Sequence, residues 1–128
     1  MSADWIGMTN ELRAGLREMR AGAPDVMKAF AGIAQAALKT NALDTKTKEL
    51  IALAIGVAVR CDDCIAFHAK AAAEQGASSE EVLETLGMAI YMGAGPSVMY
   101  AAHALDAYKQ FAQDGAAERT QDGQPARA

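Results

Sequence analysis

A chain of 128 residues, 52% of them hydrophobic, has the size of one ordinary domain with one core, which argues against a multidomain protein. Charged residues make up only 22%, and twelve basic against sixteen acidic side chains give a formal charge of −4 with no sustained basic run, so nucleic acid is not an expected partner. Alanine supplies about a quarter of the chain and aromatic residues 5%, a balance that favours helices over strands and predicts an all-α fold.

The first part of the chain predicts three helices. Apolar residues recur at helical spacing over residues 8–21 and again over 24–39. Asp44 or Thr45 can cap a third helix, which becomes apolar on every side from residue 50 to residue 59. We expect this run to be buried, within the chain or between subunits.

Three more helices are predicted after a break near Arg60. The fourth ends at about Gln75, and the Ser-Ser-Glu-Glu sequence at 78–81 is a capping signal for the fifth. The fifth ends at the Gly-Ala-Gly-Pro turn at 93–96, and a sixth helix begins there and fades after Phe111.

The sequence beyond these helices lacks residues that could join a core. From Gly115 onward it contains Gly, Ala, Gln, Arg and Asp with nothing apolar enough to bury, so we expect a disordered tail over 114–128. Residues 1–113 then form a single domain of about six helices.

No membrane span or secretory signal is apparent. The longest apolar stretch, over residues 50–59, is about half of what a helix needs to cross a bilayer. Asp4 and Glu11 interrupt the segment where a signal peptide would be apolar. We therefore expect a cytoplasmic protein that makes no membrane contact.

The chemically informative segment runs from Glu49 to His68. Cys61, Cys64 and His68 are spaced i, i+3 and i+7, so on one helix they share a stripe. Glu49 lies on the preceding helix and reaches this stripe if the two helices fold back on each other near Arg60. Two cysteines this close cannot form the framework of a small secreted scaffold, and the pair is typical of a redox or metal site.

This arrangement suits thiol chemistry. The free N–H groups of a helix start stabilise a thiolate, His68 can accept the thiol proton, and Glu49 can orient the imidazole. Asp62 and Asp63 oppose thiolate formation. A bridge between two cysteines three apart on a helix is possible but strained, because their β-carbons lie about 5–6 Å apart.

Beyond these residues, Leu50–Ile55 and the 93–96 turn followed by Tyr100 resemble the alkylhydroperoxidase D-like group of the carboxymuconolactone decarboxylase superfamily. The likeness covers about residues 25–111. The spacing Glu49, Cys61, Cys64, His68 matches that group's signature.

The resemblance implies a helical homo-oligomer, commonly a hexamer in short members and a trimer in longer ones. It also implies a thiol peroxidase without a cofactor, in which Cys64 attacks a hydroperoxide, Cys61 resolves the sulfenic acid, and His68 and Glu49 relay the proton. A dithiol or lipoyl-type reductant then restores the pair. One departure is Asp63, which stands where the longer prototype has a histidine.

Other interpretations of the same residues remain. The two thiols, His68 and Glu49 could bind zinc, or the pair could serve a non-catalytic redox sensor. Decarboxylation of a lactone is less favoured, because members with that activity lack both cysteines. We expect His103 to be structural or at an interface. Three methionines are expected to fill the core: Met88, Met92 and Met99.

Overall fold

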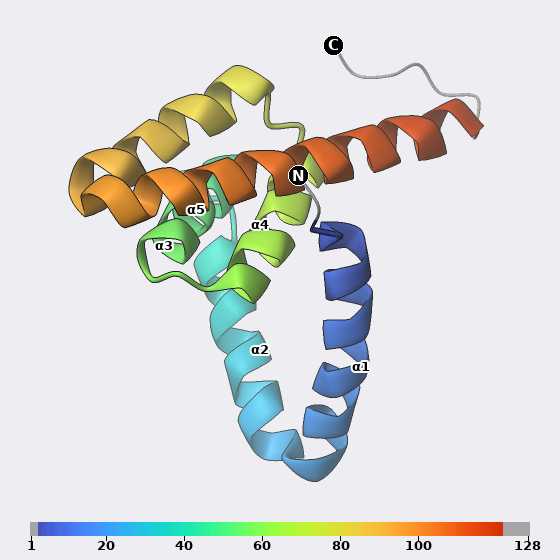
Figure 1. The fold of residues 1–128 in the computed structure, drawn as a ribbon. Coiled ribbons are helices and arrows are strands. Elements are labelled where there is room, and N and C mark those ends of the chain that lie inside the picture. Colours follow the sequence, from blue (N-terminus) through green and yellow to red (C-terminus); the bar gives the residue numbers. More distant parts are fainter. Residues whose placement is uncertain (1–2, 122–128) are drawn as a thin grey trace.

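The computed structural model describes residues 3–121, and all regular structure in that range is helical (Figure 1). The helices are α1 (Trp5–Gly22), α2 (Pro24–Leu38), α3 (Thr45–Ala58), α4 (Asp62–Glu74) and α5 (Ser79–Gln121). The predicted all-α fold is confirmed. None of the helices within the described range is long and apolar enough to cross a membrane.

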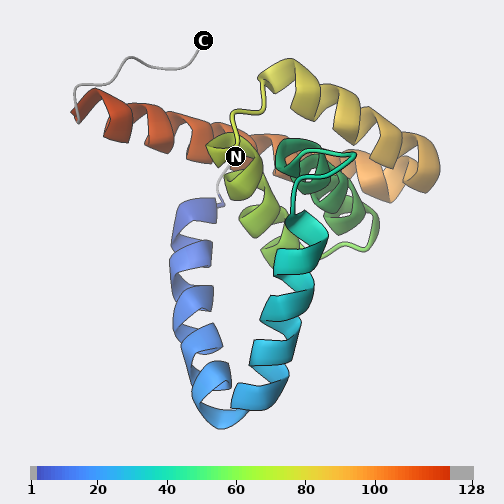
Figure 2. The same ribbon diagram turned by 180° about the vertical axis from the view of Figure 1, so that it is seen from behind.

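α5 consists of two arms that meet at a sharp corner. Ala94, with φ 54° and ψ −140°, leaves the helical region, and Pro96 follows without a backbone N–H. A Cβ atom at Gly93 would collide with the Ser97 hydroxyl oxygen and lie 3.0 Å from the Ser97 Cβ, so any other residue there would require Ser97 to move. Figures 1 and 2 show the arms folding back on each other, and they correspond to the fifth and sixth predicted helices.

The second arm of α5 extends further than the sequence predicted. It continues from Phe111 through Asp114 to Gln121, so the expected disorder of 114–121 is wrong. This stretch is rich in good helix formers, and extending an existing helix needs no new nucleus. Burial was therefore not required for helix formation. Residues 122–128 lie outside the described part of the chain.

The core lies between α3, α4 and the two arms of α5. Leu53, Val57, Ile65 and Val82 are fully buried, and small side chains on α4 and the second α5 arm allow these helices to pack closely. The buried alanines on those two elements are Ala66, Ala69, Ala72, Ala101, Ala104 and Ala107.

Trp5 attaches the start of α1 to this core. Only 2% of its surface is exposed, and its indole Nε1 donates to Asp106 Oδ2 at 3.1 Å. The side chain of Gln110 accepts the Trp5 backbone N–H at 3.0 Å and donates to the Ala3 carbonyl at 2.8 Å. No local pattern in the sequence predicts this contact.

α1 and α2 form a hairpin that projects from the body of the molecule (Figures 1 and 2). α2 has no buried residue, although its sequence is strongly apolar. Val26, Phe30 and Ile33 lie on one side of the helix and are each more than three-fifths exposed. In the described part of the single chain, no other element buries this face of α2.

Two further apolar surfaces are exposed in the single chain, and the second of them corrects a prediction from the sequence. α3 buries Leu50, Leu53 and Val57 but exposes Ile51 and Ile55, and its C-cap residue Val59 is also exposed. The single chain therefore covers the apolar run on one side only. The predicted core position of three methionines is wrong, because that side of the α5 corner faces outward. The methionines concerned are Met88, Met92 and Met99.

Candidate functional site

The turn that leads into the cysteines is a Schellman motif at the end of α3. Arg60 has φ 59°, the left-handed conformation that usually selects glycine. Its N–H donates to the Val57 carbonyl at 3.2 Å, and the Cys61 N–H donates to the Gly56 carbonyl at 3.0 Å. Carbonyls left open at the helix end are thereby satisfied, and the chain reverses directly into α4. The predicted break near Arg60 is confirmed.

Cys61 is the N-cap residue of α4. Its backbone is extended (φ −105°, ψ 98°), and its sulfur accepts the Cys64 backbone N–H at 3.2 Å. A disulfide joins the two cysteines, with their Cα atoms 5.2 Å apart. The expectation that Cys61 shares a helical stripe with Cys64 and His68 is therefore wrong, since a capping residue lies outside the helix.

Glu49 of α3 meets His68 of α4. The Oε2 atom of Glu49 lies 2.6 Å from Nδ1 of His68. The Glu49 side chain is 6% exposed and that of His68 33% exposed, so the carboxylate lies inside and the imidazole reaches toward solvent. When Glu49 is ionised, Nδ1–H donates to it, and Nε2 is the nitrogen left to accept a proton.

The lysines near Glu49 have other partners. Lys46 pairs with Glu81 at 2.8 Å, and Lys48 donates to the Lys39 carbonyl at 2.6 Å. His68 is thus the partner that the structure gives to Glu49. This separates Glu49 from an ordinary surface glutamate paired with a neighbouring lysine.

Gly56 sets the contact between α3 and the first turn of α4. A Cβ atom built there would lie 3.4 Å from the Cys64 Cβ and 3.5 Å from the Ile65 nitrogen. Alanine would just fit, but any larger side chain would push α4 away. Gly56 is not among the predicted site residues, although a glycine in an apolar helix is a signal of close approach.

The charges around the cysteines are arranged about the start of α4. Asp62 and Asp63 are exposed in its first turn, where negative charge stabilises the helix dipole, and Arg60 is exposed just before it. In the described range, no group of three or more His, Cys, Asp or Glu side chains is arranged to hold a metal ion.

His103 lies apart from this site. Its ring centroid is 6.0 Å from that of Trp5 and 6.0 Å from that of Tyr100, in edge-on and tilted arrangements. These contacts place it in an aromatic cluster between α1 and the second arm of α5. Packing accounts for its position.

The four predicted site residues therefore lie together. Cys61 is bonded to Cys64, His68 follows Cys64 by one turn of α4, and Glu49 is bonded to His68. The arrangement places a base, with the carboxylate that orients it, on the same helix face as the sulfur of the first turn. It can exchange protons and electrons at sulfur.

The model of the carboxymuconolactone decarboxylase family matches residues 24–107, which is most of the chain. The chain belongs to this family. The match spans the cysteine pair, His68 and Glu49, and is consistent with an alkylhydroperoxidase D-like member. Membership and the Cys-x-x-Cys disulfide together fit a redox role for this group.

Two solved structures are similar over nearly the whole fold. A carboxymuconolactone decarboxylase family protein from Legionella pneumophila is 49% identical with a TM-score of 0.83, covering 84% of this chain and 96% of that one. A family protein from Thermotoga maritima is 28% identical with a TM-score of 0.74, and the match covers 94% of this chain and 99% of that one. That protein is described as possibly involved in an antioxidative response.

Among curated sequences, an uncharacterised protein of Cupriavidus necator is 41% identical over 105 residues, covering 77% of this chain and 93% of its own. An uncharacterised protein of Haemophilus influenzae is 40% identical over 108 residues, and the match covers 84% of this chain and 96% of that protein. These relatives have nearly the same length as the fold described here.

Proposed function

We propose that this protein is a thiol-dependent peroxidase, a dithiol–disulfide oxidoreductase that reduces hydroperoxides through Cys61 and Cys64. The observation that carries the proposal is the 2.6 Å contact between buried Glu49 and His68, one turn after Cys64. A buried carboxylate that orients an imidazole near a thiol is what activation of a nucleophile requires. The antioxidative description of the Thermotoga maritima relative supports the same chemistry.

The catalytic cycle begins with the reduced pair. Nε2 of His68 accepts the Cys64 thiol proton while Nδ1 stays bound to Glu49. The thiolate attacks one peroxide oxygen, the S–O bond forms as the O–O bond breaks, and the leaving alkoxide takes up a proton to become an alcohol. The Cys64 sulfenic acid then condenses with the Cys61 thiol, releasing water and forming the disulfide.

A dithiol or lipoyl-type reductant completes the cycle. It delivers two electrons and two protons to the disulfide and becomes a disulfide itself. Cys61 is half-exposed at the helix start and has no helical turn in front of it, so it is the sulfur that we expect the reductant to attack.

The test follows peroxide consumption with dithiothreitol as the electron donor. Cys64→Ser should abolish turnover, whereas Cys61→Ser should accumulate a Cys64 sulfenic acid that dimedone traps. Glu49→Gln should slow alkylation of the reduced Cys64 thiol, because the imidazole loses its orienting charge. His103→Gln, which changes the histidine outside the site, should keep full activity. Full turnover by Cys64→Ser, or none by the unmodified protein, would contradict the proposal.

A redox sensor or zinc protein would behave differently. Metal analysis of freshly purified, reduced protein should find no stoichiometric zinc, and peroxide should be consumed over many turnovers rather than once. Stoichiometric zinc bound through the two thiols would replace the peroxidase proposal.

We also propose that the chain forms a homo-oligomer. Exposed large apolar side chains cover one face of α2, one face of α3 and the corner of α5. Each such side chain contributes on the order of 100 Å² of apolar surface, so together they exceed the roughly 800 Å² that one partner buries in a standard interface. Every copy of the chain carries the same three apolar faces, so in a symmetric homo-oligomer neighbouring copies can cover them. The hexamer or trimer and the cytoplasmic location stay predictions.

A further inference from the structure

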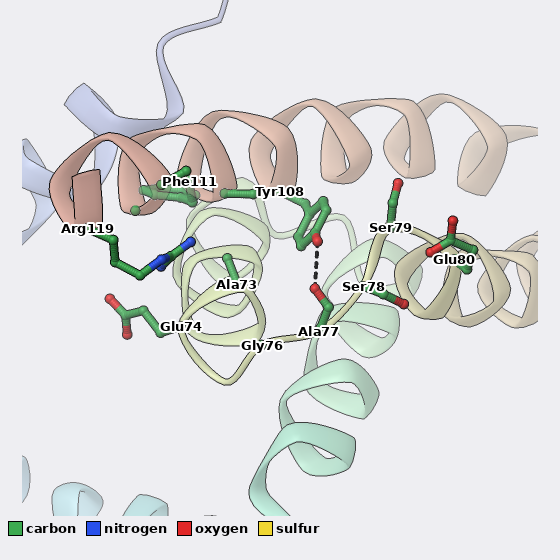
Figure 3. Close-up of a pocket in the computed structure, with 13 residues that line it drawn as sticks. Ala73, Glu74, Gly76, Ala77, Ser78, Ser79, Glu80, Tyr108, Phe111 and Arg119 are labelled. Carbon is green, nitrogen blue, oxygen red and sulfur yellow. Dashed lines mark hydrogen bonds between the residues drawn. The ribbon is translucent and has the colours of Figure 1, made fainter. Parts of the chain in front are cut away.

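A hollow lies at the opposite end of α4 from the cysteines (Figure 3). It has a volume of about 340 Å³ and lies between the C-terminal end of α4, the loop into α5 and the second arm of α5. Since α4 has 13 residues, it is separated from the disulfide by roughly 20 Å of helix. The proposed peroxidase chemistry makes no use of it.

The pocket has two aromatic rings on one wall and small residues beside them, which leave room for a ligand. Tyr108 and Phe111 line one side, and the Tyr108 hydroxyl is occupied because it donates to the Ala77 carbonyl at 2.6 Å (Figure 3). Burial is the main reason why the pKa of Tyr108 is raised above its ordinary value, so the ring meets the pocket as a neutral group. Ala112 and Gly115, one helix turn further along, leave the room beside the rings.

Arg119 brings to this pocket a guanidinium nitrogen that lacks a hydrogen-bond partner in the described part of the chain. This nitrogen, Nε, is shielded from solvent. The side chain extends into the hollow alongside Phe111 and Ala73 (Figure 3). A shielded guanidinium nitrogen without an acceptor is costly, and a planar anion is the partner that its fork of donors fits.

The acidic residues of the pocket are placed so that they do not compete for Arg119. Glu74 pairs with Lys70 at 2.5 Å, and Glu80 lies at the other end of the pocket from Arg119 (Figure 3). Glu74 lies at the same end of the pocket as Arg119, but its carboxylate is already paired with Lys70, so Glu80 at the far end is the acidic residue of the pocket for which no ion pair is found in the described part of the chain (Figure 3). An anionic group would be attracted to the Arg119 end and repelled from the Glu80 end.

We propose that this pocket binds a small carboxylate with a flat apolar body. The carboxylate pairs with the guanidinium of Arg119, and the body packs against Tyr108 and Phe111 in the space beside Ala112. Sites of this volume with apolar walls and one convergent charged group are typical of small-molecule binding. The ligand site is independent of the cysteine pair.

The test titrates the full chain with 3-phenylpropionate by calorimetry and uses the neutral 3-phenylpropionamide as the matched ligand. The carboxylate should bind with a Kd of about millimolar, and the amide at least about tenfold more weakly. Arg119→Gln should lower the affinity for the carboxylate at least about tenfold, whereas Arg17→Gln, an exposed arginine of α1, should leave it unchanged.

Two further variants separate the pocket from folding and from catalysis. Ala112→Leu should fill the space and weaken binding while the helical circular dichroism stays the same. Cys64→Ser should bind the carboxylate like the unmodified protein, whatever its effect on peroxide turnover. Equal binding of acid and amide, equal binding by Arg119→Gln, or no saturable binding to the unmodified protein would overturn the proposal.

Discussion

Arg60 is the residue on which the geometry of the cysteines depends most directly. Its left-handed backbone is a conformation in which a side chain costs about 1–2 kcal/mol relative to glycine. The same turn supplies the Cys61 N–H bond to the Gly56 carbonyl, so the end of α3 and the cap of α4 are fixed together. At α4 the equivalent position is Gly76, with φ 81° and no such cost.

Arg60→Gly is therefore expected to stabilise the fold. Glycine relieves the backbone strain in the folded state but also adds conformational freedom to the unfolded chain. The net effect should raise the free energy of unfolding by about 0.5–1 kcal/mol. Urea denaturation of the disulfide form at one protein concentration measures this. Arg60→Ala is the control, because it removes the guanidinium but keeps the Cβ. An equal gain from Arg60→Ala would assign the effect to charge rather than to strain.

At the residue scale, spacing predicted that Cys64, His68 and Glu49 come together, but it placed Cys61 within the helix that Cys61 in fact caps. Cys64 and His68 lie one turn apart on any helix, and Glu49 needed only a reversal near Arg60. The contacts of Trp5 could not be predicted in this way, because Asp106 and Gln110 lie about a hundred residues further along the chain. Such pairings are a product of tertiary packing, and no local pattern encodes them.

At the scale of the helices, the caps explain why most predicted ends are correct. Asp44 accepts the Thr47 N–H at 2.8 Å at the start of α3. At α5, Ser78 accepts the Glu81 N–H at 3.1 Å while Glu81 accepts the Ser78 N–H at 2.9 Å, which is the predicted capping box. These signals are local and therefore visible in the sequence. The last turns of α5 have no such signal, and their extent was mispredicted.

The capping box makes the stability of α5 dependent on pH. The hydrogen bond from Lys46, and then the one from the Ser78 N–H, lower the pKa of Glu81 below its ordinary 4.5. A pKa that is lower in the folded state contributes stability above the ordinary value, and this contribution disappears as the pH falls through the lowered value. The charged form is therefore the one that caps the helix and pairs with Lys46.

Glu81→Gln should consequently lower the Tm at neutral pH. The difference in Tm between the variant and the unmodified protein should shrink as the pH falls below about 4. Thermal melts across this range, followed by circular dichroism, measure the gap. Glu84→Gln removes an equal charge from an exposed position on the same helix and should show a smaller gap with little dependence on pH. A gap for Glu81→Gln that stays constant down to pH 3 would contradict the linkage.

At the scale of the whole molecule, the single chain is incompletely covered. The sequence predicted burial for the apolar run of α3, and burial is found on one side only. The exposed faces of α2, α3 and the α5 corner carry few charges, whereas an exposed helix face is normally polar. These faces can be covered only by other molecules, so the identity of the covering partner follows neither from the sequence pattern nor from the single chain.

The α2 face offers the most direct test of self-association, because its side chains contribute little to the core of their own chain. Phe30 is 63% exposed, so Phe30→Glu should leave the monomer folded while placing a charge in the apolar contact between copies. Sedimentation velocity should find the unmodified protein well above its monomer mass of 13.4 kDa and the variant shifted toward it. Gln35→Glu adds the same charge to the opposite side of α2 and should leave the assembly intact. A monomeric unmodified protein, or a Phe30→Glu variant that assembles like it, would show that α2 is not a contact between copies.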